Sequence, residues 1–203
     1  DYGLQDEWQG DLQGKRQITK TVTKRSLDWT ELRSLSADRG ILAQQIECMR
    51  LVCNAFATEG IPVIHTIYSP FAQASRLGGA DFTIRNMRTH PDRLRTGLNV
   101  ITESTLRFIE ALWRIPNVAG IFYVTEFANY DKMSEAEYAS FAMPYNLKIL
   151  ESLPERWWFN IVQVQGNAPM IRLFSDLPVQ VINWDTREGH PDLSRVKSLF
   201  KGA

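Results

Sequence analysis

Polar side chains suited to acid–base or hydrogen-bond chemistry lie at the ends of four short apolar runs. The runs cover residues 61–67, 118–124, 159–164 and 179–183, and the polar residues that end or follow them are Tyr68, Glu126, Gln163, Gln165 and Asp185. Such runs are typical of parallel strands buried on both faces, and in barrels of these strands the chemistry lies just beyond their C-terminal ends. The sequence therefore predicts one substrate site at a shared rim.

Two charged residues are the main candidates for acting on a substrate there. Arg76 precedes a Gly-Gly pair, and its guanidinium fork matches a carboxylate, although a surface pair with Asp81 is an equal alternative. Glu126 is the one acid that ends a long apolar run, which suits a general acid or base, or else a structural hydrogen bond to a neighbouring loop. Tyr68 either donates a hydrogen bond or packs at the rim. We assign Glu126 and Asp185 as catalytic candidates, and as substrate-binding candidates Tyr68, Arg76, Gln163, Gln165 and Arg187.

Two other polar groups have competing interpretations. Asp185, Arg187 and His190 follow the last apolar run closely, so they either reach the substrate or form a local salt-bridged loop. His65 lies within the first run, with Val63 and Ile67 on the same side of an extended chain. This placement favours a packed core histidine over a base in the pocket.

Segments with helical spacing separate the four runs and set the fold class. The predicted helices cover residues 29–35, 38–58, 81–88, 91–113, 134–153, 169–174 and 192–200, with another opening at Pro70 and a capping box formed by Ser134 and Glu137. Helices between strands imply parallel pairing through right-handed crossovers. We predict an α/β fold, a (β/α)₈ TIM-type barrel that is incomplete here, lacking its first strand and its last one or two.

An incomplete barrel leaves two open sheet edges, which proteins normally cover or pair. Four strands are clear, and residues 16–24 resemble one further exposed strand. We therefore treat residues 1–203 as a single partial barrel domain that is not self-sufficient. Either a longer chain or a second chain, for example in a homodimer, would complete it.

Composition limits the remaining classes of function. The chain has 203 residues, 44% of them hydrophobic, and its 23 basic and 23 acidic residues balance, so nothing indicates a surface for nucleic acid or an acidic membrane. No apolar run approaches the ~20 residues of a membrane span. Cys48 and Cys53 are expected to be small packing residues, which together with the absence of a signal peptide predicts a cytoplasmic protein.

Four short motifs follow one another in a fixed order and spacing. They are Tyr2-Gly3-Leu4, Ile61-Pro62-Val63-Ile64 with Ser69-Pro70-Phe71 and Leu77-Gly78-Gly79, Phe141-Ala142-Met143-Pro144-Tyr145, and Val181-Ile182-Asn183-Trp184-Asp185. This set resembles the uroporphyrinogen decarboxylase superfamily over nearly the whole chain. The resemblance implies a (β/α)₈ barrel and two known chemistries, of which one is a cofactor-independent decarboxylation of a tetrapyrrole in porphyrin biosynthesis. Of the decarboxylase contacts, the tyrosine falls on Arg76 and the serine near Ala128, so both differ.

The other chemistry is zinc-dependent methyl transfer from corrinoid proteins to thiols. The resemblance places its His-x-Cys zinc ligands on Gln163 and Gln165, before Gly166. Amides are poor zinc ligands, so we expect neither zinc nor another cofactor. Our first hypothesis is a decarboxylase-family enzyme that acts on a tetrapyrrole. The alternatives are a zinc-less, corrinoid-linked methyltransferase or demethylase component, and a non-catalytic barrel fragment.

Overall fold

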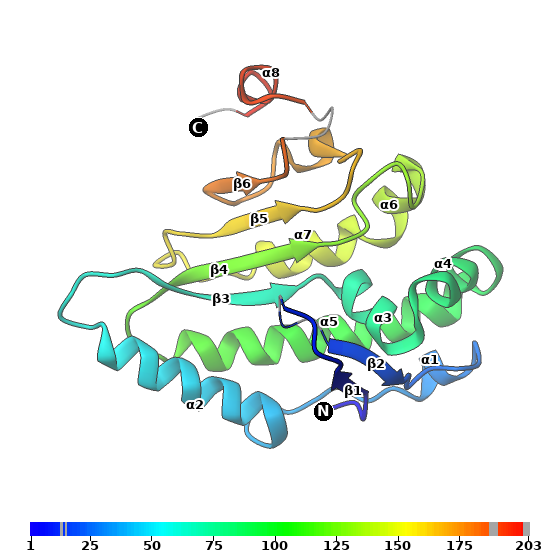
Figure 1. Cartoon of the computed structure of the whole chain (residues 1–203), viewed down its shortest axis with the longest axis horizontal. Coiled ribbons are helices and arrows are strands. Elements are labelled where there is room, and N and C mark those ends of the chain that lie inside the picture. Colours follow the sequence, from blue (N-terminus) through cyan, green and yellow to red (C-terminus); the bar gives the residue numbers. More distant parts are fainter. Residues whose placement is uncertain (13, 15, 187–190, 201–203) are drawn as a thin grey trace.

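A parallel sheet lies at the centre of the computed structural model, which describes residues 1–12, 14, 16–186 and 191–200. Its four strands pair in sequence order, β3-β4-β5-β6, and all point the same way (Figure 1). They are β3 (Val63–Tyr68), β4 (Val118–Thr125), β5 (Ile161–Val164) and β6 (Val181–Asn183). The predicted strands and their parallel pairing are thus confirmed.

Helices connect consecutive strands, as a βα barrel requires. The elements are α1 (Asp28–Glu31), α2 (Gly40–Ala55), α3 (Pro70–Gly78), α4 (Ala80–Thr89), α5 (Pro91–Trp113), α6 (Glu135–Phe141), α7 (Met143–Leu150), the 3-10 turn η1 (Ile171–Phe174) and α8 (Leu193–Lys197). The capping box of Ser134 and Glu137 is present at α6. The expected continuous helix over 134–153 is wrong, because it breaks at Ala142, just before Pro144, which has no amide hydrogen to donate.

The start of α2 also differs from expectation. The helix begins at Gly40 instead of Asp38, and its N-cap residue supplies no side-chain hydrogen bond. Instead, the carboxylate of Asp1 accepts hydrogen bonds from the backbone amides of Ile41 and Leu42, at 2.8 and 2.9 Å. The first residue of the chain therefore caps a helix 40 positions away, which local spacing could not reveal.

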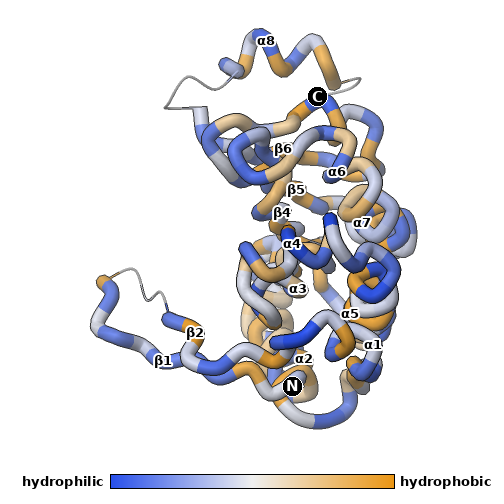
Figure 2. Tube along the Cα trace, turned by 90° about the vertical axis from the view of Figure 1, so that its right-hand side faces the viewer, coloured by the Kyte–Doolittle hydropathy of each residue, from blue (hydrophilic) through white to orange (hydrophobic). Residues whose placement is uncertain are grey.

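In the part of the chain that the structure describes, the helices between the strands cover one face of the sheet. In β5, Val162 and Val164 are buried, whereas Ile161 and Gln163 alternate with them and are half-buried. The covered face of β4 includes Tyr123, whose hydroxyl donates a 2.9 Å hydrogen bond to Asn146 of α7. Viewed from the side, α5 and α7 lie together on one side of the strands (Figure 2). The opposite face corresponds to the inside of a barrel.

A two-stranded hairpin extends on the uncovered side of the sheet. Strands β1 (Gln5–Trp8) and β2 (Arg16–Lys20) are antiparallel, and all of their residues are exposed. Figure 2 shows the hairpin projecting away from the helices. The exposed strand expected at residues 16–24 is therefore present over 16–20, but it pairs with β1 and does not join the barrel sheet.

These features define an α/β fold that is an incomplete (β/α)₈ barrel. Each strand is followed by helical structure, and neighbours in the sheet are neighbours in sequence. The strands β3 and β6 form the two edges of the described sheet. No helix in the described ranges is long and apolar enough to cross a membrane.

Asn160 joins three strands at the N-terminal end of the sheet. Its side-chain oxygen accepts from the amide of Ile121, and its side-chain nitrogen donates to the carbonyl of Trp157 at 2.8 Å. Its backbone carbonyl accepts from Val181 at 3.1 Å. Gly120 permits this approach, since a Cβ there would lie 2.8 Å from the Asn160 side-chain oxygen and 2.3 Å from the carbonyl oxygen of Phe159.

We expect Asn160→Ala to lower the free energy of unfolding by about 2 kcal/mol, because it leaves buried backbone groups without partners. Chemical denaturation of the parent and the variant measures this difference. Asn99→Ala, at an exposed position of α5, is the matched control and should change stability little. An Asn160→Ala variant as stable as the control would contradict the role of this residue.

We also expect residues 1–203 alone to associate or to bind hydrophobic dyes. The reason is that β3 and β6 present unpaired edges, and Val181 on the uncovered face is exposed. Light scattering over a concentration series and dye fluorescence would detect this behaviour. A monomer that unfolds in one cooperative transition and binds no dye would show the expectation to be wrong.

Candidate functional site

Three of the predicted site residues contact one another at the C-terminal ends of β3 and β4. The Nη2 atom of Arg76 lies 2.5 Å from the Oε1 atom of Glu126 in a hydrogen-bonded ion pair. The Arg76 guanidinium carbon lies 4.2 Å from the centroid of the Tyr68 ring, in a cation–π contact. Arg76 therefore pairs with Glu126 and not with Asp81, its alternative partner.

Local structure explains how these side chains meet. The backbone amide of Ser69 donates to the carbonyl of Val124 at 2.9 Å, which extends the pairing of β3 and β4 beyond Tyr68. Ser69 also caps α3, because its hydroxyl accepts from the amide of Ala72, and Pro70 occupies the first turn. The helix ends soon after Arg76, which therefore lies in its last turn, while Glu126 directly follows β4.

The ion pair is partly shielded and leaves one donor without a partner. The side chains of Arg76 and Glu126 are 42% and 24% exposed. The Nε atom of Arg76 is buried and has no hydrogen-bond partner among the described residues. The Tyr68 hydroxyl has no such partner in the described ranges either. The site thus retains hydrogen-bonding capacity in addition to the ion pair.

A polar hollow of about 340 Å³ adjoins Glu126. Its lining includes Gln165 on the loop after β5, and Asn129, Asp131 and Lys132 on the loop after β4. The sequence analysis missed the last three residues. The available signal was the polar segment between the β4 run and the capping box at Ser134, which must cross the rim to reach α6.

Gln163 lies at the same level along the strands as Tyr68. In the strand register Tyr68 pairs with Val124, and Val124 pairs with Gln163. Residues paired in this way share a face, and Gln163 lies on the face opposite the buried Val162 and Val164. The hydroxyl of Thr125 donates to the backbone carbonyl of Gln163 at 2.7 Å, which fixes β5 against β4.

Among the described residues, Asp185 and His65 do not contact this group. Asp185 follows β6, is exposed and does not line the hollow beside Glu126. Arg187 and His190 lie outside the described residues, so the salt-bridged loop stays a prediction. His65 is half-buried, with its ring centroid 5.2 Å from that of Phe108 in α5. Burial lowers the pKa of His65, which agrees with the packed histidine that its position predicts.

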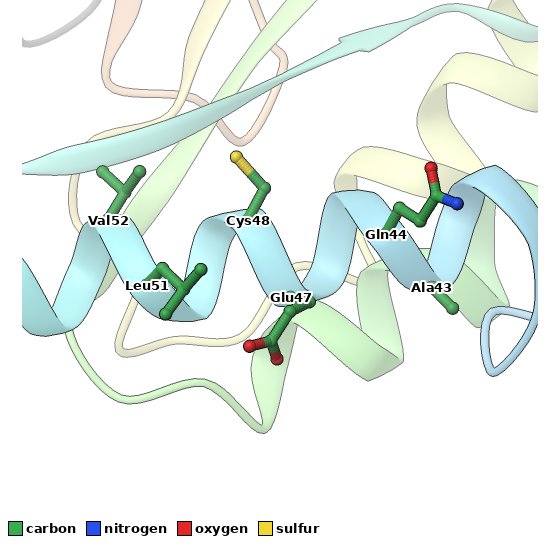
Figure 3. Close-up of a pocket in the computed structure, with 6 residues that line it drawn as sticks. All are labelled: Ala43, Gln44, Glu47, Cys48, Leu51 and Val52. Atoms are coloured by element: carbon green, nitrogen blue, oxygen red, sulfur yellow. The ribbon is translucent and has the colours of Figure 1, made fainter.

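A second, larger hollow lies on α2, away from the rim. It is shallow and lined by Ala43, Gln44, Glu47, Cys48, Leu51 and Val52 (Figure 3). Cys53 is buried as expected, but the expectation that Cys48 packs inside is wrong, because α2 presents it on an exposed face. This hollow contains none of the predicted site residues.

The residues at the expected zinc position do not fit that metal. Gln163 and Gln165 offer only amide groups. Within the described ranges, no group of three or more His, Cys, Asp or Glu residues is placed to hold a metal ion. We therefore derive no chemical step through zinc at this site.

The fold and the rim define a class of protein, a TIM-barrel relative with its polar site at the C-terminal ends of the strands. The family model of uroporphyrinogen decarboxylase (URO-D) matches residues 12–201. The chain therefore belongs to the uroporphyrinogen decarboxylase family, as its motifs predicted.

Known relatives include methyltransferases. Methylcobamide:CoM methyltransferase MtbA of Methanosarcina acetivorans and that of Methanosarcina mazei are each 23% identical to this chain over 160 residues. Each match covers 78% of this chain and 46% of the relative, so the chain spans about half the length of these curated relatives. A solved methyltransferase from Methanosarcina mazei has a TM-score of 0.73 at 18% identity, covering 89% of this chain and 52% of that one. This likeness shows the fold.

We expect the protein to retain no stoichiometric zinc after dialysis against a chelator, because glutamine amides replace the stronger ligands. Elemental analysis measures the retained metal. The double variant Gln163→His, Gln165→Cys is the matched comparison and should bind zinc more tightly than the parent. Stoichiometric zinc in the dialysed parent would refute the expectation.

Proposed function

We propose that this chain is part of a methyltransferase that moves a methyl group from a methylated cobamide to a small acceptor with an anionic group. The names of the two similar relatives support methyl transfer over the decarboxylation that was our first hypothesis. A cytoplasmic location belongs to the same proposal and agrees with the two free cysteines.

The observation that carries this proposal is the contact of Arg76 with Glu126 and Tyr68 at the ends of β3 and β4. Arg76 would hold the anionic group of the acceptor through the guanidinium N–H groups that Glu126 leaves free, because its side chain is 42% exposed. Tyr68 fixes the plane of the guanidinium from one side. Glu126 lies between this arginine and the hollow that contains Gln165, in reach of an acceptor bound there.

The transfer itself needs a nucleophile and a proton acceptor. A thiol acceptor would lose its proton to Glu126, and the sulfur lone pair would form the new bond to the methyl carbon. The bond between cobalt and the methyl carbon would break, with both electrons remaining on the cobalt of the cobamide. Charge balances, because the proton moves from the thiol to Glu126 and the methyl group moves from cobalt to sulfur without its bonding electrons. Arg76 would keep the acceptor oriented during attack.

Decarboxylation of a tetrapyrrole is the second candidate. The match to the uroporphyrinogen decarboxylase model and the guanidinium at the rim favour it. Against it, the tyrosine and the serine of the decarboxylase contacts fall on Arg76 and near Ala128 in this chain, so both contacts differ. Binding of uroporphyrinogen, weakened in Arg76→Ala, would support this candidate instead.

The test uses methylcobalamin as the donor and two matched thiols, anionic mercaptopropionate and uncharged mercaptoethanol. Loss of the methylcobalamin absorbance measures the rate. We expect Arg76→Ala to raise KM for mercaptopropionate about 10-fold and to leave KM for mercaptoethanol unchanged, with Arg76→Lys intermediate. Glu126→Gln should lower kcat about 100-fold with both thiols.

Arg88→Ala is the matched control, because Arg88 also forms an ion pair, with Glu137, and neither residue lines the hollow beside Glu126. Its kinetics should equal those of the parent. The assay uses the longer chain or the assembly that completes the barrel, and absence of methyl transfer by that parent with either thiol would overturn the proposed function. Equal effects of Arg76→Ala on both thiols would remove Arg76 from the recognition of the anionic group.

A further inference from the structure

Asn129 connects the two loops that carry Glu126 and Gln165. Its side-chain nitrogen donates to the backbone carbonyl of Glu126 and to that of Gln165, each at 3.4 Å. Its side-chain oxygen accepts from the backbone amide of Asp131 at 3.1 Å. The residue is only 3% exposed, and both ends of its amide are thus used within the protein.

Gly166 makes room for this amide. A Cβ at position 166 would lie 2.4 Å from the side-chain nitrogen of Asn129, too close for any other residue without displacing it. The φ angle of Gly166 is +130°, a backbone conformation that residues with a side chain rarely adopt. The loop after β5 is therefore shaped around the side chain of Asn129.

Backbone contacts join the same two loops beside Asn129. The amide of Tyr130 donates to the carbonyl of Ala168 at 2.9 Å. The amide of Met170 donates to the carbonyl of Ala128 at 2.8 Å. These bonds fix the loops beyond the hollow. Closer to the site, the Asn129 side chain is bonded to the backbone of both Glu126 and Gln165, which line the hollow.

We propose that Asn129 is a positioning residue, which holds the Glu126 carboxylate against Arg76 and sets its separation from Gln165. This role rests on the proposed methyl transfer. Asn129 acts on the acid through the main-chain carbonyls of Glu126 and Gln165, to which its side-chain nitrogen donates. Loss of its donors would release the Glu126 loop and disturb the ion pair with Arg76.

Asn129→Asp tests this role, because it keeps the shape but directs a carboxylate oxygen at two carbonyl oxygens. We expect kcat for methyl transfer to fall about 10- to 100-fold, with KM for mercaptopropionate changed less than about threefold. Asn146→Asp is the matched control, since Asn146 is also a buried amide, bonded to Tyr123 and Tyr138 behind the sheet. It should lower the melting temperature and leave kcat unchanged.

A second readout does not depend on turnover. The side-chain Nε–H signal of Arg76, observed by nitrogen NMR, reports the environment of the ion pair in the substrate-free protein. We expect Asn129→Asp to shift this signal and to speed its exchange with solvent, and Asn146→Asp to do neither. Gly166→Ala should reproduce the effect of Asn129→Asp and serves as the second variant if the first does not fold.

The two readouts separate this inference from the proposed function. No turnover in the parent, with an Arg76 signal that moves in Asn129→Asp, would overturn methyl transfer but retain Asn129 as the residue that positions Glu126. Turnover in the parent, with kcat and the Arg76 signal unchanged in Asn129→Asp and in Gly166→Ala, would overturn the inference. Equal losses in Asn129→Asp and Asn146→Asp would also overturn it, since they would reflect stability alone.

Discussion

The parallel register of β3 and β4 is the constraint on which the candidate site depends. Because Tyr68 lies beside Val124, the residues that follow these two strands leave the sheet at the same rim. The Ser69 amide continues the pairing past the end of β3, and the cap at Ser69 starts α3 in a fixed direction. A shift of one residue would move Glu126 to the other face of the sheet and out of reach of Arg76.

Among the described residues, the sheet is covered on one face because the barrel is incomplete. In a closed barrel, one face packs on the helices and the other on side chains from the opposite strands. Here α5 and α7 cover the first face, while Gln163 and Val181 on the second have no layer of strands against them within the described part of the chain. The likeness to about half of a solved methyltransferase agrees with this geometry. The rim is nevertheless formed within the described residues, because its contacts connect neighbouring strands.

The sequence could predict the elements because their signals are local. Apolar runs gave the four strands, and the capping box at Ser134 gave the start of α6. The break before α7 was missed although Pro144 is a local signal for it. The cap supplied by Asp1 was missed because it depends on a contact across 40 positions. Strand ends also placed Tyr68 and Glu126 correctly. The choice between Asp81 and Glu126 as the partner of Arg76 could not be made, because it depends on the direction in which α3 leaves the sheet.

The ion pair also limits what the site can bind. The Arg76–Glu126 pair is close to neutral, so an anionic group that displaced Glu126 would leave a 24% exposed carboxylate without its cation. A ligand that keeps the pair must instead use the exposed guanidinium N–H groups that Glu126 leaves free. In the proposed methyl transfer, such a ligand would lie close to the Glu126 carboxylate. That arrangement requires the Glu126 loop to stay fixed to the loop of Gln165, as the Asn129 side chain fixes it.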